Sequence, residues 1–192
     1  SSSSAASDVY KSQALKRMRR EHKWLKKQGI DSIDPHEALL EVCEKHPNYY
    51  DTRYARDKNG RNVVAYMPAH APTDFVFSGK TNLAKFLSAE IHRYDLGAAD
   101  MEEARRGLCL VAVTDGTLGV KAGYRFLRVL TKARDVLHDM HSNRVKQIVS
   151  EVPSFLANLV QIAKGILPAK LAARVTCVGS TKELDSHLDL SA

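Results

Sequence analysis

The sequence predicts an α/β domain with a mainly parallel sheet flanked by helices. The second half of the chain alternates short β-branched apolar runs with longer segments of helical period. Residues 107–114 (GLCLVAVT) form a continuous apolar run, which is typical of a strand buried on both faces. Because a strand–helix–strand order requires right-handed crossovers, these strands are expected to be parallel.

The first 46 residues predict a leader and two helices. Residues 1–8 are small and mostly polar, which indicates a disordered leader without the apolar core of a signal peptide. Residues 9–28 are helix-forming, and Gly29 is placed to end that helix. A second helix is expected between its N-cap Asp34 and Pro47. Its inward face is expected to hold Ala38, Leu39, Val42 and Cys43.

Residues 47–192 form the second predicted unit. Tyr49–Tyr54 is aromatic and extended, and Asp57–Gly60 is expected to be a hairpin turn that leads into a strand over 62–67. The later elements are a loop over 68–72, helices over 81–94, 122–139, 154–167 and 181–188, and strands over 107–114, 145–152 and 174–179.

Composition indicates a globular protein of a reducing compartment. Hydrophobic residues make up 44% of the chain and charged residues 27%. The three cysteines, Cys43, Cys109 and Cys177, are odd in number and widely spaced, which does not suit a disulfide framework. Cys109 and Cys177 lie in β-like apolar runs and are expected to be small buried hydrophobic residues. The longest apolar run, Leu108–Val113, is too short to cross a bilayer. A cytoplasmic location with peripheral membrane contact is therefore expected.

The formal charge of +7 is unevenly distributed. Between residues 11 and 27, eight lysines and arginines are opposed only by Glu21. A second group follows the outer face of the predicted helix 122–139 and comprises Lys121, Arg125, Arg128 and Lys132. Such patches favour anionic lipid head groups or nucleic acid, and a solvated helix face is the alternative. No aromatic-interleaved basic strand or recognition motif supports a nucleic-acid partner, so none is expected.

The predicted helix 154–167 (SFLANLVQIAKGIL) is apolar around most of its circumference. Its markedly polar residues, Asn158, Gln161 and Lys164, fall on one narrow stripe. Such a helix must be buried on more than one side, or must cover something apolar that is not protein. Periodicity alone leaves both interpretations open.

Catalytic signatures are not found in the sequence. Ser78–Thr81 imitates the end of a phosphate-binding loop, but Asp74 stands where that loop needs glycine. His138 and His141 have no cysteine or acidic ligands clustered near them in the sequence. Asp115 follows the most apolar strand and is the best lone carboxylate, without a base or nucleophile that can be placed beside it. We therefore expect a non-enzyme with no catalytic residue, no metal and no cofactor.

Three segments together resemble a known family. They are residues 49–66 (YYDTRYARDKNGRNVVAY), 107–116 (GLCLVAVTDG) and 143–184, which runs from NRVKQIVSEVPSFL to VTCVGSTKEL. Within the first, Asp57, Gly60 and Arg61 match a turn that enters the first strand of the CRAL-TRIO lipid-binding domain. Residues 15–34 are similar to the last helix of that family's N-terminal helical domain. The resemblance rests on the order of these pieces over about four-fifths of the chain.

The resemblance implies a lipid pocket floored by the sheet and lidded by helix 154–167 as a gate. The pocket residues it implies are Leu110, Ala112, Phe126, Leu130, Ile148, Phe155, Leu159, Ile162, Ala163, Ile166 and Val175. The membrane and head-group contacts it implies are Lys121, Arg125, Arg128, Lys132 and Arg174. It also implies a longer parent protein, of which this chain retains a remnant of the helical domain and a C-terminally truncated lipid-binding domain.

The family's head-group contacts differ here, which leaves the ligand open. Met140–Asn143 stand where phosphatidylinositol-binding members carry a Tyr-Pro-Glu-Arg-like stretch, and Arg174 stands in place of a lysine. Leu108 and Leu110 occupy positions that contact a choline head group. The expected ligand is one hydrophobic lipid, with fatty acid, sterol and isoprenoid all open, held for transfer between membranes or presentation to a partner. The alternative is an interaction or membrane-recruitment module on the same fold, with other domains of the parent protein as partners.

Overall fold

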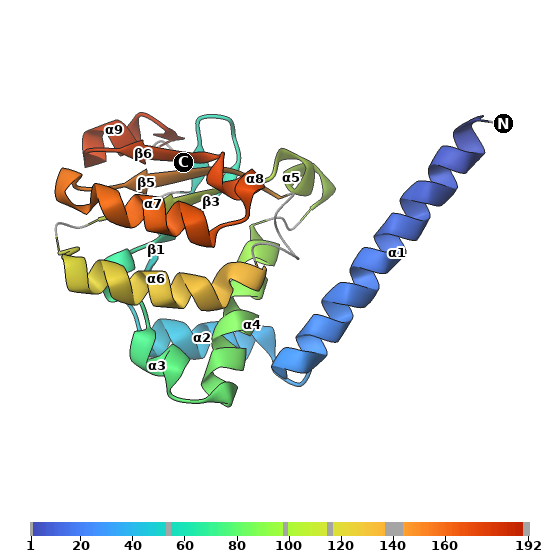
Figure 1. The fold of residues 1–192 in the computed structure, drawn as a ribbon, viewed down its shortest axis with the longest axis horizontal. Coiled ribbons are helices and arrows are strands. Elements are labelled where there is room, and N and C mark those ends of the chain that lie inside the picture. The colour runs from blue at the N-terminus through green and yellow to red at the C-terminus, as the bar shows by residue number, and fades with distance from the viewer. Residues whose placement is uncertain (1, 53–54, 98–99, 115–116, 137–143, 190–192) are drawn as a thin grey trace.

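The computed structural model of the chain describes residues 2–52, 55–97, 100–114, 117–136 and 144–189. It is a mixed α/β fold in which a mainly parallel sheet is flanked by helices, as predicted (Figure 1). The strands are β1 (Tyr50–Asp51), β2 (Arg56–Asp57), β3 (Asn62–Tyr66), β4 (Leu108–Ala112), β5 (Val145–Glu151), β6 (Val175–Val178) and β7 (Leu188–Asp189). The α-helices are α1 (Ser2–Gln28), α2 (Pro35–Lys45), α3 (Thr73–Phe77), α4 (Lys80–Leu96), α5 (Met101–Arg106), α6 (Val120–Asp135), α7 (Ala157–Ile166), α8 (Ala169–Ala172) and α9 (Thr181–Asp185). Two 3-10 turns, η1 (Pro68–His70) and η3 (Ser154–Leu156), complete the described elements.

The sheet has the strand order β6-β5-β4-β3-β2-β7. Strands β3 to β6 run parallel, and the helices between them provide the crossovers. The short strands β1 and β2 pair antiparallel with two stretches of β3, and β7 pairs antiparallel with β2. The predicted hairpin is present, and its turn places Gly60 at a positive φ of 70°.

Strand β4 is the centre of the fold. Leu108 and Leu110 point into a large core shared with α2, α4 and α6, whereas Cys109 and Val111 point into a smaller core that includes Leu184 of α9. All four side chains are buried, which confirms the prediction of a strand covered on both faces. Burial raises the pKa of the Cys109 thiol to about 12, so this cysteine is the inert apolar residue that was expected.

Helix α1 begins at Ser2, inside the segment expected to be a disordered leader, and projects away from the rest of the chain (Figure 1). Only its last turns, through Trp24 and Leu25, pack against the main core. The next helix follows its predicted signals, because the Asp34 carboxylate accepts hydrogen bonds from the backbone N–H groups of His36 and Glu37.

Several finer expectations were wrong. Cys43 and Cys177 are exposed rather than inward. Cys177 lies in β6, the edge strand of the sheet, where neither face is fully covered. Helices α3 and α5 were not predicted, since each is too short to show a clear period. Residues 68–70 of the expected loop form the 3-10 turn η1. Asp115, His138, Met140–Asn143 with His141, and the predicted end of helix 122–139 lie outside the described residues.

No helix in the described part of the chain combines the length and apolarity needed to cross a membrane.

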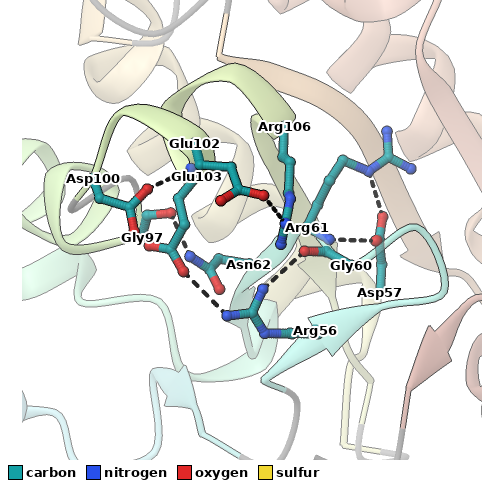
Figure 2. A network of polar contacts seen from close by, with 10 residues as sticks. All are labelled: Arg56, Asp57, Gly60, Arg61, Asn62, Gly97, Asp100, Glu102, Glu103 and Arg106. Atoms are coloured by element: carbon teal, nitrogen blue, oxygen red, sulfur yellow. Dashed lines mark hydrogen bonds and ion pairs between the residues drawn. The ribbon is translucent and has the colours of Figure 1, made fainter.

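A polar network fastens the hairpin to the rest of the domain (Figure 2). Asp57 is 1% exposed and accepts hydrogen bonds from the Arg61 backbone N–H at 2.9 Å and from its Nε at 2.6 Å. The same guanidinium reaches Gln147 of β5 at 2.7 Å. Arg56 donates to the Gly60 carbonyl and forms an ion pair with Glu103 of α5. The turn Asp57–Arg61, whose sequence matches the CRAL-TRIO turn, therefore fastens the hairpin to β5 and α5.

Removing Asp57 is expected to destabilise the fold far more than removing a neighbouring exposed carboxylate. Asp57→Ala leaves the largely buried Arg61 without its partner, which should lower the free energy of unfolding by about 3 kcal/mol. Glu102→Ala breaks the exposed pair with Arg106 and should cost less than about 1 kcal/mol. Urea denaturation of both variants checks this, and equal losses would contradict the structural role of Asp57.

Candidate functional site

An apolar pocket lies between one face of the sheet and helices α6 and α7. The empty space between its lining atoms is about 1080 Å³, including its opening to solvent. Its lining is mostly apolar with a few polar side chains, as in small-molecule sites. We take this pocket as the candidate site.

The floor of the pocket is a row of apolar side chains across three parallel strands. Leu110 of β4 pairs in register with Ile148 of β5, which pairs with Val175 of β6. Residues in register point to the same face of a parallel sheet, so the three side chains lie side by side. Two residues further along, Ala112 and Ser150 extend the floor.

Helix α6 forms the wall. Gly123, Phe126, Leu127 and Leu130 line the pocket at spacings of three and four residues, the period of one helix face. Gly123 also allows α6 and α7 to approach closely, because a Cβ atom at this position would lie 2.4 Å from Leu159 Cδ1. The two helices lie side by side over the sheet (Figure 1).

Helix α7 is the cover of the pocket. Leu159, Val160, Ala163 and Leu167 line the inner side, together with Leu156 of η3. Most residues of α7 are apolar, yet none of its side chains is fully buried. A helix packed directly onto a filled core would bury its inner face, so α7 covers space rather than side chains.

Most of the expected pocket residues line the cavity, and three do not. Those that line it are Leu110, Ala112, Phe126, Leu130, Ile148, Leu159, Ala163 and Val175. Phe155 is 66% exposed and Ile162 is 44% exposed, and Ile166 lies at the edge of the lid outside the lining. The reason is geometric: a helix that covers a surface turns only part of its circumference inward, and Ile162 shares the outer side with Ala157 and Gln161.

The expected head-group residues lie outside the pocket. Lys121, Arg125, Arg128 and Lys132 are exposed on the outer side of α6. The guanidinium of Arg128 lies 4.4 Å from the ring centroid of Phe77, and Lys132 flanks the same ring. Arg174 donates to the Val145 carbonyl and is not part of the lining, so its expected contact with a membrane or head group stays a prediction.

The pocket has a polar end that the sequence analysis missed. Tyr49, Tyr66, Tyr94 and Glu90 line it, and none of these residues is more than 7% exposed. Glu90 of α4 accepts hydrogen bonds from Tyr66 Oη at 2.9 Å and from Tyr50 Oη at 2.7 Å. The hydroxyls of Tyr66 and Tyr94 lie 2.6 Å apart. We call Tyr49, Tyr66, Tyr94 and Glu90 the tyrosine–glutamate end of the pocket.

Burial is the largest influence on the pKa of each of these groups. It raises the pKa of Glu90 above its ordinary value, an effect that the two tyrosine hydrogen bonds and the Arg93 guanidinium oppose. Burial also raises the pKa of Tyr49, Tyr66 and Tyr94, so these hydroxyls stay neutral. The Tyr66 hydroxyl donates to Glu90, whereas the Tyr49 hydroxyl offers one donor and an acceptor at the end of an apolar space.

Arg93 lies next to this cluster but outside the pocket lining. Its guanidinium lies 4.0 Å from the ring centroid of Tyr50 and donates to the Ala65 carbonyl at 3.1 Å. Its Nη1 is buried and has no hydrogen-bond partner in the part of the chain that the structure describes. In the sequence, the pair Tyr49–Tyr50 and the i, i+4 pair Glu90–Tyr94 were visible. Nothing in their spacing shows that they meet.

Comparison with known proteins adds no relative. No protein-family model matches the chain, and no curated protein matches it. Within the described ranges, no group of three or more His, Cys, Asp or Glu side chains is placed to hold a metal ion. The pocket and its polar end therefore carry the functional argument.

Glu90→Gln is expected to change how stability depends on pH. Because the pKa of Glu90 is raised in the folded state, the unfolded chain releases this proton first, and wild-type stability falls as the pH rises above the ordinary value of 4.5. Glutamine cannot titrate, so the unfolding free energy of the wild type relative to the variant should decrease between about pH 4.5 and 7. Urea titrations at several pH values measure it, with the exposed Glu44→Gln as control. A relative stability that rises with pH would contradict the direction of the shift.

Proposed function

We propose that this chain binds a single hydrophobic lipid in the pocket, as a non-catalytic domain of the CRAL-TRIO type. The observation that carries the proposal is the cover helix α7, which is apolar yet has no fully buried side chain over an apolar space. A lipid chain would fill that space and complete the burial of the inner face of α7. The resemblance of segments 49–66, 107–116 and 143–184 to that family supports the same reading of the pocket.

Burial of the lipid supplies the affinity. Each buried methylene contributes about 0.8 kcal/mol, so a chain of ten carbons supplies about 8 kcal/mol before the ordering costs of binding. The floor row of Leu110, Ile148 and Val175 and the wall residue Phe126 offer apolar surface along the pocket. No bond to the lipid has to form or break.

The outer sides of α6 and α7 are suited to an anionic membrane surface. Val120 and Tyr124 of α6 are about half exposed, as is Ile162 of α7, and Phe155 precedes that helix. Lys121 and Arg125 stand beside Val120 and Tyr124 on the same exposed arc of α6. Apolar side chains next to cations favour an interface of head groups and acyl chains, and they lie where the lid would have to open.

Filling the pocket is expected to abolish lipid loading. Ala163 lines the pocket and Ala157 of the same helix faces solvent, so Ala163→Trp and Ala157→Trp form a matched pair. Protein incubated with mixed liposomes and extracted for lipid mass spectrometry should yield one lipid class near equal stoichiometry for the wild type and Ala157→Trp, and less than about a tenth of that for Ala163→Trp.

The outcomes separate the two functions considered. If the wild type never acquires lipid, lipid binding is refuted. If vesicle binding survives Ala163→Trp undiminished while no lipid is retained by any variant, the fold serves as a recruitment module instead.

Reversing two charges on α6 is expected to weaken membrane binding. Lys121→Glu with Arg125→Glu removes two cations from the proposed contact face, and each contributes about 1 kcal/mol at an anionic surface. Binding to phosphatidylserine vesicles in a sedimentation assay should fall at least about thirty-fold. Lys58→Glu with Lys182→Glu changes the same charge on exposed residues away from α6 and should have a smaller effect. Equal losses would show that net charge alone, rather than this face, drives binding.

A further inference from the structure

The tyrosine–glutamate end distinguishes among lipid classes. Resting on the proposed function, we propose that the lipid held in the pocket is an uncharged alcohol, with its hydroxyl group against Tyr49 and Glu90. The residues that carry this inference are the charged and hydroxyl groups of the lining and the position of Arg93 behind it.

The charges of the lining disfavour an anionic head group in the pocket. In the described part of the chain, Lys164 is the one cationic residue of the lining, whereas Glu90 and Glu151 are acidic. Lys164 belongs to the lid, and the acidic Glu90 lies among the tyrosines. A carboxylate or phosphate placed at that end would lose its hydration with no cationic residue of the described lining beside the tyrosines.

Arg93 does not supply the missing cation. Its guanidinium lies over the ring of Tyr50, and the described lining includes neither Tyr50 nor Arg93. An anion in the pocket would have to displace the Tyr50 side chain, and its hydrogen bond to Glu90, to reach that cation. A lipid amine would be a second buried cation near Arg93 and would have to give up its hydration there.

The unused hydrogen-bonding capacity matches a hydroxyl group. Tyr49 is 3% exposed, lines the pocket, and its hydroxyl has no hydrogen-bond partner among the described residues. Glu90 accepts one hydrogen bond at each carboxylate oxygen and has capacity for more. An alcohol can accept from Tyr49 and donate to Glu90, so both needs are met by one neutral group. A hydrocarbon without a polar group would leave Tyr49 buried and unsatisfied.

The experiment compares probes that share a dodecyl chain and differ in their terminal group. 1-Dodecanol, dodecanoate and dodecylammonium compete with the neutral fluorophore N-phenyl-1-naphthylamine for the full chain at about pH 7.5. We expect 1-dodecanol to bind at least about ten-fold more tightly than either charged probe. Dodecanoate binding as tightly as 1-dodecanol would overturn the inference.

Removing one hydroxyl tests the contact itself. Tyr49→Phe keeps the ring and removes the oxygen, and the wild type is the reference. Tyr49→Phe should weaken 1-dodecanol about five- to ten-fold, and dodecyl methyl ether, which cannot donate to Glu90, should bind weakly to both proteins. An unchanged affinity for 1-dodecanol in Tyr49→Phe would overturn the assigned contact. If that variant does not fold, the order of the three probes on the wild type decides.

The two proposals fail in different ways. If neither the fluorophore nor any dodecyl probe binds the wild type more tightly than Ala163→Trp, the pocket holds no lipid and the proposed function fails. If all probes bind the wild type equally and Ala163→Trp abolishes them, lipid binding stands and the preference for an alcohol fails.

Discussion

The parallel sheet centred on β4 has to be covered on both faces, and its two faces are covered differently. On one face, Cys109, Val111 and Val149 pack tightly with Leu184 and Leu188. On the other, α4 covers one half closely, while α6 and α7 span the remainder and leave the pocket. Protein interiors are normally packed without such space, so the second face has been kept open at a cost in stability. That cost is recovered if a ligand supplies the missing contacts.

The tyrosine–glutamate end sets the chemistry of that space. Burying Glu90 would be unfavourable without the hydroxyls of Tyr50 and Tyr66, which hold it between two strands and the helix α4. A core built only for stability would replace this cluster with apolar side chains of the same volume. Its position at the end of the pocket is the observation on which the proposed ligand contact rests.

The sequence predicted the sheet and the lid better than it predicted the lining. The apolar run 107–114 indicated a strand covered on both faces, and the near-continuous apolarity of 154–167 indicated an unusual cover. Periodicity does not tell which arc of such a helix turns inward, so it could not show that Phe155 and Ile162 lie outside the lining. The polar end joins Tyr66 to Glu90 across 24 residues and Tyr50 to Glu90 across 40, a contact that depends on tertiary packing and leaves no local pattern.

The exposed apolar residues of the lid follow from the same geometry. A helix that must close over a lipid needs an apolar inner side, and a helix that must open within a membrane interface gains from an apolar outer side as well. Leu159 and Ala163 meet the first requirement, and Phe155 with Ile162 meets the second. The narrow contact at Gly123 lets α7 lie close to α6 without side chains interlocked at that point. Under the proposed function, a segment apolar on nearly every side would face two environments, a lipid beneath the helix and a membrane interface outside it.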